Sequence, residues 1–398
     1  MFYFIINNVC DKLFSMEIRQ ISYFNEFICK GCECPETCCR GWLIPLEKED
    51  LERYSKEKGL MKARLMLAMS EHSIPVFNSS CGECTFHERS GLCSLQVKRG
   101  HDFIPETCRN YPRFYRNYGL FEERYLDLSC IEAANMLISH VKDLSLVLAM
   151  GEPDCDKTIT NDDEPFLNRL LRIRSDMQSA LAGVTDFDDL CSVLGAIDSY
   201  AMRLQDAYLH GDEDYPDKHP FTYVRSDAGG FDAPEVRDVD RIFPLKAGEI
   251  TALTDTSIYH IRLRKKNPGL YKLFSLYFNK YRRDLASENG WTRAYTDFGV
   301  RHRELIPFFA AYYSYYLYQY WLRIWEDYSF VRHARLGIIH LSMLLLLCIV
   351  YEKEHQSVTS AELAHIIAVY NRRAFFSDEL LDSMYRVLDG RSANPFTG

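Results

Sequence analysis

The segment Cys29-Lys-Gly-Cys-Glu-Cys34-Pro-Glu-Thr-Cys38-Cys39-Arg-Gly-Trp42 places five cysteines within fourteen consecutive residues. Five more follow at wider spacing: Cys81, Cys84, Cys93, Cys108 and Cys130. These ten make up most of the 14 cysteines of the 398-residue chain. The other four are scattered: Cys10, Cys155, Cys191 and Cys348. Cysteine is therefore a property of one module and not of the whole chain.

The composition predicts a globular protein that does not coat nucleic acid. Hydrophobic residues make up 47% and charged residues 26% of the chain, which is ordinary for a folded protein. The net charge of −9 leaves no surplus of Lys and Arg to neutralise phosphates, so we expect no nucleic-acid partner.

The apolar stretches predict a cytoplasmic protein without a membrane partner. Residues 1–6 are apolar but are too few for a secretory signal and lack its basic start and its cleavage site. The longest apolar stretch, residues 336–350, is shorter than the ~20 residues that cross a bilayer. We expect it to form a buried core helix.

Reduced thiols grouped this densely predict metal binding more strongly than disulfides or unligated thiols. Zinc sites commonly combine two close pairs of ligands, often with histidine, whereas cubane iron–sulfur clusters take four thiolates. His87 and His101 lie in this region without the His-x-x-x-His spacing, and we interpret each as a surface histidine or a neighbour of the ligands. The residues alone leave zinc and iron–sulfur equally open.

The hydrophobic pattern predicts a mainly α fold, in which a cysteine-rich metal-binding module precedes a helical body. We expect the module to cover residues 1–150 and the helical domain residues 151–398, because an acidic linker begins at Gly151. A polar stretch near residues 210–234 predicts a long loop. Nine aromatic residues between Phe308 and Trp321 predict a buried helix whose tyrosine hydroxyls find partners, and an aromatic wall for a substrate is the alternative.

Charged residues flank two of the cysteines. Arg109 and Arg113 follow Cys108 and are candidate cofactor-binding residues, because a guanidinium can form two parallel hydrogen bonds to a carboxylate of a substrate or cofactor. Glu132 follows Cys130 and either caps a helix or positions an amine for removal of a proton.

The motifs around the cysteines occur in a distinctive order. Cys38-Cys-Arg-Gly-Trp42 precedes Gly91-Leu-Cys-Ser-Leu-Gln96, which precedes Thr107-Cys108, Tyr111-Pro-Arg113 and Leu128-Ser-Cys-Ile-Glu132. In this order they resemble the flagellin lysine N-methylase family, and the cysteines also resemble the wider set of CxxCxxCC-type zinc- or iron-chelating proteins. The resemblance covers roughly residues 20–140, and Ile131 stands where the family often has proline.

The resemblance implies an enzyme that transfers a methyl group from S-adenosylmethionine to surface lysines of flagellin, the protein of the bacterial flagellum. It also implies a protein-bound [4Fe–4S] cluster that takes part in the transfer. The implied pool of metal ligands is Cys29, Cys34, Cys38, Cys39, Cys84, Cys93, Cys108 and Cys130. Cys32 and Cys81 look like additions to the family's set, and the choice of four cluster ligands stays open.

Two absences limit the predicted mechanism. The chain has no glycine-rich strand–loop–helix of the dinucleotide-binding type and no Cys-x3-Cys-x2-Cys run. No residue is identified as the general base. The alternative function is a non-catalytic metal-binding or metal-delivery protein with a helical interaction domain, and a zinc-stabilised scaffold with another activity comes third.

Overall fold

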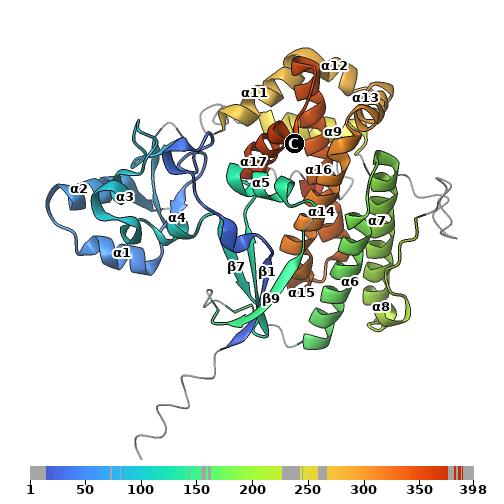
Figure 1. Ribbon diagram of the computed structural model, residues 1–398, viewed down its shortest axis with the longest axis horizontal. Helices are drawn as coiled ribbons and strands as arrows, with labels where there is room; N and C mark the ends of the chain where they lie inside the picture. The colour runs from blue at the N-terminus through green and yellow to red at the C-terminus, as the bar shows by residue number, and fades with distance from the viewer. Residues whose placement is uncertain are drawn as a thin grey trace, which may run out of the picture.

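The computed structural model describes residues 15–374 apart from 72–73, 81, 143, 154–157, 160–162, 226–242, 244 and 259–266, and also residues 381, 384–386 and 388. Within this part, a large helical body carries a small lobe at one end, and a sheet lies where the two meet (Figure 1). The predicted mainly α fold class is confirmed. The hydrophobic pattern predicted no strands, whereas the described residues between 16 and 151 form nine of them.

A four-stranded sheet sets the position of the small lobe. Its strands, in spatial order, are β7 (Arg113–Asn117), β8 (Phe121–Leu126), β1 (Met16–Ile21) and β9 (Leu146–Gly151). β1 runs parallel to β8 and antiparallel to β9. A parallel pair needs a long crossover connection, and here the crossover contains the whole small lobe. The lobe is therefore an insertion between two strands of the sheet.

The small lobe has a hydrophobic core of its own. Tyr54 stacks on Phe77 at 5.5 Å between ring centres and packs on Phe103, and Phe86 meets Phe77 edge-on at 4.8 Å. The buried residues of this core form a cluster separate from that of the helical body. The lobe's elements are β2 (Ile44–Pro45), α1 (Lys48–Ser55), α2 (Gly59–Ala68), β3 (Met69–Glu71), β4 (Pro75–Phe77), β5 (Ser79–Ser80), β6 (Glu83–Cys84), α3 (Ser94–Arg99) and α4 (Glu106–Asn110).

The helical body is built around one long buried helix, α16 (Phe330–His355). Of the described helices, α16 alone is long and apolar enough to cross a membrane, and 89% of its most apolar window is buried inside the protein. The core helix predicted for residues 336–350 is therefore confirmed. The other helices of the body are α5 (Ile131–Ser139), α6 (Glu164–Ala182), α7 (Phe187–Leu209), α8 (Tyr215–Lys218), α9 (Ala247–Ile258), α11 (Pro268–Leu276), α12 (Arg282–Leu285), α13 (Glu288–Arg301), α14 (Ile306–Tyr320), α15 (Ile324–Asp327) and α17 (Ser360–Ala374).

The aromatic run forms α14, which attaches the sheet to the helical body. Tyr315 accepts a hydrogen bond from the backbone N–H of Leu126 at 2.9 Å and donates its hydroxyl proton to the carbonyl of the same residue at 2.7 Å. Tyr318 donates to the carbonyl of Arg19 at 2.8 Å. The predicted buried helix with satisfied hydroxyls is confirmed, and these bonds replace water as the partner of the phenol groups.

One hydrophobic core runs across the boundary expected at residue 150. Ile21 and Leu126, from the sheet, belong to the same buried cluster as the helices that follow. A buried ion pair between Arg174 of α6 and Glu123 of β8 crosses it as well, with side chains 3% and 2% exposed. The division of the chain into domains at residue 150 stays a prediction. The strands β1 and β8, which precede residue 150, contribute to the same hydrophobic core as the helical body.

Two polar segments were singled out in the sequence. Residues 210–225 of the expected polar loop contain the single turn of α8, and residues 226–234 of it lie outside the described residues. The acidic linker begins at the end of β9 and runs into α6, where Asp163 accepts a hydrogen bond from the N–H of Phe166 at 2.9 Å. That bond satisfies one free N–H of the first turn of the helix.

We predict that Gly337→Ala destabilises the protein, because α16 and α14 approach closely at this glycine. A Cβ atom there would lie 2.5 Å from Tyr316 Cδ1 and 2.6 Å from Tyr313 Cε2. The expected loss is about 1–3 kcal/mol in the free energy of unfolding, measured by urea denaturation. The matched control is Gly195→Ala in α7, where a Cβ meets nothing within 4 Å and a gain of up to about 1 kcal/mol is expected. Equal stability of the two variants would show that the packing at Gly337 is looser than described.

Candidate functional site: two groups of thiols

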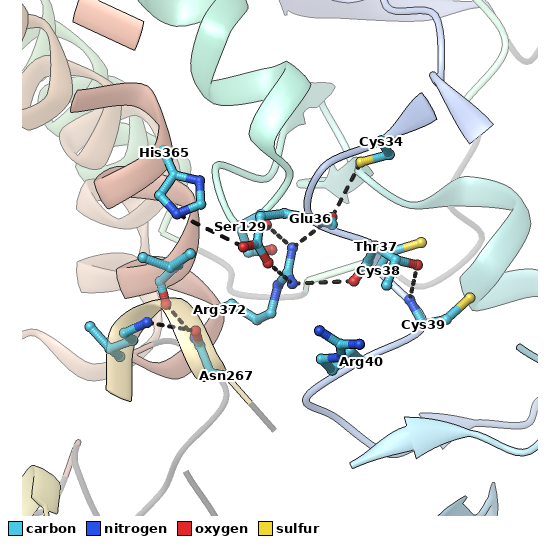
Figure 2. Close-up of polar contacts among 12 residues, drawn as sticks. Cys34, Glu36, Thr37, Cys38, Cys39, Arg40, Ser129, Asn267, His365 and Arg372 are labelled. Carbon is cyan, nitrogen blue, oxygen red and sulfur yellow. Dashed lines mark hydrogen bonds and ion pairs between the residues drawn. The ribbon is translucent and has the colours of Figure 1, made fainter. Parts of the chain in front are cut away.

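Arg372, in the last turn of α17, holds the first cysteine segment against the helical body (Figure 2). Its guanidinium donates to Glu36 Oε2 at 3.3 Å, to the carbonyl oxygens of Glu36 and Thr37 at 3.1 and 3.2 Å, and to the carbonyl oxygen of Ser129 at 3.1 Å. The arginine side chain is only 5% exposed. His365 Nε2 lies 3.8 Å from the other carboxylate oxygen of Glu36. One buried cation therefore joins three distant parts of the chain.

Two of those three parts carry cysteines. Glu36 and Thr37 lie between Cys34 and Cys38, and Ser129 immediately precedes Cys130. The Cys34 thiol donates to the carbonyl of Glu36 at 3.3 Å, on the same segment.

An ion pair brings the segment of a fourth cysteine, Cys29, close to Cys130. Lys30, which follows Cys29, places Nζ 2.6 Å from Glu132 Oε2, and Glu132 lies two residues after Cys130. The thiol of Cys130 also lies within electrostatic reach of Cys29 and Cys34. We call Cys29, Cys34, Cys38 and Cys130 the junction set, because they gather where the lobe meets the helical body.

Three of the sequence motifs meet at the junction set. The indole N–H of Trp42 donates to the carbonyl of Cys38 at 2.5 Å, and the Trp42 ring packs edge-on against Tyr111 with ring centres 5.0 Å apart. The Tyr111 hydroxyl lies 3.0 Å from Ser129 Oγ. The Gly-Trp, Tyr-Pro-Arg and Ser-Cys motifs thus form one packed unit that links Cys38 to Cys130.

The other four thiols gather inside the small lobe. The N–H of Cys84 donates to the carbonyl of Cys39 at 2.8 Å, and an ion pair between Arg40 and Glu83 supports this contact, with Arg40 Nε 3.0 Å from Glu83 Oε1. Cys84 and Cys93 pack against the core of the lobe, as does Cys108 of α4. We call Cys39, Cys84, Cys93 and Cys108 the lobe set. The adjacent residues Cys38 and Cys39 are assigned to different sets by their backbone contacts, and their thiols are hydrogen-bonded to each other.

The thiols differ in how readily they lose a proton. A hydrogen bond from the Cys38 thiol lowers the pKa of Cys39 to about 6, although burial opposes this shift, and the same bond raises the pKa of Cys38. Burial raises the pKa of the other partly or fully buried motif thiols. These are Cys34, Cys84, Cys93, Cys108 and Cys130. A bound metal ion would have to displace these protons, since only the thiolate is a ligand.

The chemistry of the two sets fits a metal centre, although their present side-chain positions do not form one. All eight motif cysteines are free thiols. Among the described residues, no three Cys, His, Asp or Glu side chains stand close enough together to hold a metal ion. Each cysteine has three staggered χ1 positions, so thiols on neighbouring backbone segments can converge without a change of fold. Metal binding by the cysteine-rich module therefore stays a prediction.

The candidate residues beside the cysteines take different places. Arg113 donates to the carbonyl of Phe27 at 3.0 Å and so holds the backbone that leads into the junction set. Arg109 donates to the carbonyl of Asp102 at 3.3 Å, on the exposed face of the lobe. Cys32 is exposed, and Cys81 lies outside the described residues. The roles of Arg109 and Arg113 in cofactor binding stay predictions.

Sequence reasoning missed Arg372, the residue that organises the junction set. Arg372 lies 335 and 336 positions after its partners Thr37 and Glu36, and it ends a helix where basic residues are common on electrostatic grounds alone. Nothing in its local sequence distinguishes it from Arg373. A pairing at this separation is decided only by the packing of α17 on α5.

A cavity of about 590 Å³ lies between α6, α14 and residues 141–146. It opens beyond the last turn of α5, whereas Cys130 precedes the first turn of that nine-residue helix. No cysteine is among the residues that line the cavity. The cavity is therefore not part of the thiol site.

The chain is similar to three Salmonella proteins over about a third of its length. It is 24% identical to the flagellar biosynthetic protein FliU of Salmonella muenchen over 146 residues, which are 34% of this chain and 82% of that protein. It is also 24% identical to the lysine-N-methylases of Salmonella typhimurium and Salmonella choleraesuis over 133 residues, 31% of this chain. The match spans only 32% of each lysine-N-methylase. No family model and no solved structure matches the chain. These partial similarities support a distant relation to the lysine-N-methylase family.

We predict that Arg372→Leu destabilises the protein by about 3 kcal/mol, because three carbonyl oxygens and a carboxylate lose their donor at a buried position. The measurement is urea unfolding, combined with mass-spectrometric mapping of alkylated thiols. We expect Cys34 and Cys38 to be alkylated faster in the variant.

Arg303→Leu serves as the control for this prediction. The Arg303 side chain is 67% exposed, and its loss should change stability by no more than about 0.5 kcal/mol. If the two variants unfold alike and their thiols react at wild-type rates, Arg372 does not hold the junction set.

Proposed function

We propose that this chain is an S-adenosylmethionine-dependent protein-lysine N-methyltransferase whose substrate is flagellin. The similarity to proteins named lysine-N-methylase carries the proposal, and the similarity to a flagellar biosynthetic protein supports the choice of substrate. The geometry of the junction set supplies a place where a lysine side chain can bind. The substrate, the methyl donor and the iron–sulfur cluster are parts of the proposal.

The junction set is our choice for the [4Fe–4S] cluster. Cys29 is exposed and Cys34 and Cys38 are half-buried, so a group bound there could be reached by a protein substrate. If three of these four thiols hold the cluster, its fourth iron would be open to chelate the amino and carboxylate groups of the methyl donor. Arg372 would hold the segment that carries Cys34 and Cys38 in place.

Glu132 is our candidate for the residue that binds the substrate amine. Its carboxylate already holds a lysine ammonium, that of Lys30, with 2.6 Å between Oε2 and Nζ. The Lys30 side chain is 46% exposed, so an incoming lysine can replace it without disturbing the core. The first turn of α5 fixes Glu132 next to Cys130.

In the proposed reaction, Glu132 orients the lysine and takes up its proton on the way to solvent. Only the neutral amine is a nucleophile, because the ammonium has no lone pair. The amine nitrogen forms a bond to the methyl carbon as the bond between that carbon and the sulfonium sulfur breaks. S-adenosylhomocysteine leaves, and the product is the N-methylammonium, because the positive charge passes from the sulfonium sulfur to the nitrogen.

We predict that anaerobically purified protein methylates flagellin in the presence of S-adenosylmethionine. Each methyl group adds about 14 Da to a lysine in peptide mass spectra. Cys34→Ser should lose both the visible absorption of the cluster and the methylation, whereas Cys191→Ala in α7 should keep both. Unmodified flagellin together with bound metal would favour the metal-binding or metal-delivery function.

We predict that Glu132→Gln raises the KM for flagellin at least about tenfold, because a neutral amide no longer pairs with an ammonium. Lys30→Met is the matched control. It removes the internal competitor for Glu132 and should leave the KM unchanged or lower it. Thermal unfolding of both variants shows whether the ion pair matters for stability instead. Equal KM values for the two variants would exclude Glu132 from amine binding.

A further inference from the structure

The strand β9 forms an open, apolar edge of the four-stranded sheet. It is the last strand in the spatial order, and among the described residues no further strand pairs with it. Its six residues, Leu146-Val-Leu-Ala-Met-Gly151, include no charged side chain. Two of its large side chains are open to solvent, since Leu148 is 62% and Met150 is 68% exposed. An exposed apolar edge strand is a template on which another strand can pair.

The opposite edge of the same sheet lacks these properties. Its strand, β7, carries two arginines, Arg113 and Arg116. The chain also returns beside β7, where Asn117 forms a β-bridge with Thr158. Charged residues on an edge strand and a segment that covers it both oppose pairing with another molecule. The two edges therefore differ, and β9 is the one suited to bind a strand.

The hydrogen bonds of β9 determine which backbone groups are directed toward the open edge. The carbonyl of Ser145 accepts a hydrogen bond from the N–H of Ser22 at 2.9 Å, so Ser145 faces the side of β1. In an antiparallel pair, the N–H and C=O groups of successive residues point alternately to the two sides of a strand. Leu146, Leu148 and Met150 therefore direct theirs toward the open edge, as donors and acceptors for a further strand.

We propose that β9 pairs antiparallel with β9 of a second copy of this chain, about a two-fold axis at Val147. In this register, Leu146 lies opposite Leu148 of the second copy, and the outward-directed backbone groups of the two strands meet. An interface about a two-fold axis uses the same surface of both copies, so each of its contacts occurs twice. The two four-stranded sheets then form one continuous sheet.

The charges at the two ends of β9 favour a second copy as its partner. Lys142 lies in the turn that precedes the strand, Glu152 directly follows it, and both residues are exposed. In the antiparallel register about Val147, Glu152 of each copy lies beside the turn that carries Lys142 of the other. Opposite charges across a strand pair stabilise it, whereas like charges oppose it. A strand with opposite charges at its two ends is therefore complementary to itself.

The first test is analytical ultracentrifugation of the full-length protein over a range of concentrations. We expect a monomer–dimer equilibrium with a roughly micromolar Kd, because an interface made by one strand pair is small. Leu148→Lys should leave the protein monomeric, since a lysine on an edge strand opposes pairing. A protein that is monomeric at every concentration, or a dimer that Leu148→Lys leaves intact, would overturn the proposal.

Leu209→Lys is the matched control for this substitution. Leu209 ends α7 and is 73% exposed, so the same change of side chain should leave the Kd of the dimer unchanged. Circular dichroism of both variants shows that they are folded. Equal weakening of the dimer by the two variants would mean that β9 is not the interface.

Charge reversal tests the register without changing the apolar strand. Lys142→Glu and Glu152→Lys should each weaken the dimer about tenfold, because two attractive pairs become two repulsive ones. An equimolar mixture of the two variants should associate as tightly as the wild type, because a mixed dimer again pairs a lysine with a glutamate at both ends. A mixture that associates no better than the separate variants would exclude the pairing about Val147.

An extended segment of flagellin is the competing occupant of this edge. Hydrogen exchange distinguishes the two, because pairing slows the exchange of the outward N–H groups of Leu146, Leu148 and Met150. Slow exchange that depends on protein concentration without flagellin supports the proposal, and protection that requires flagellin overturns it. The pairing does not depend on the methylase activity, which is measured separately on the same samples.

Discussion

The structure around the thiols depends on the hydrogen bonds that the Arg372 guanidinium donates. A buried cation is stable only when its donors are paired, and here the partners are a carboxylate and three backbone carbonyls from Glu36, Thr37 and Ser129. These partners come from segments that are far apart in the sequence. Because one side chain holds the backbone after Cys34, before Cys38 and before Cys130, the junction set exists only when α17 is packed in place.

The topology of the sheet accounts for the second group of thiols. The small lobe is inserted between β1 and β7, so two chain segments connect it to the sheet. Its stability must come mainly from contacts inside the lobe. Its hydrophobic core is separate from that of the helical body. The peptide bond between Cys38 and Cys39 is the point at which the chain passes from the junction set to the lobe set.

The proposed activity agrees with the absence of a nucleotide-binding fold in the described part of the chain. The described strands form a mixed four-stranded sheet and two smaller antiparallel ones, without the parallel sheet and glycine-rich turn that bind a cofactor in doubly wound folds. Under the proposed function, a metal-bound group at the junction set would hold the methyl donor instead. The pairing of Lys30 with Glu132 at the same place indicates how a lysine from another protein would be held.

The amino-acid sequence by itself determined the helical class, the buried helix at residues 336–350, the aromatic helix and the concentration of thiols before residue 131. These features are local, because helical periodicity and the spacing of cysteines can be read within short windows of the chain. The sequence did not predict the strands, since β1, β7, β8 and β9 alternate poorly. Contacts distant in the sequence stabilise β1 and β8: α14 bonds to them from 299 and 189 residues away, and α6 bonds to β8 from 51 residues away. It also did not predict the division of eight cysteines into two sets of four. Only the tertiary structure decided that division, because it follows from contacts of Arg372 with Glu36, Thr37 and Ser129, and of Cys39 with Cys84, that no local pattern encodes.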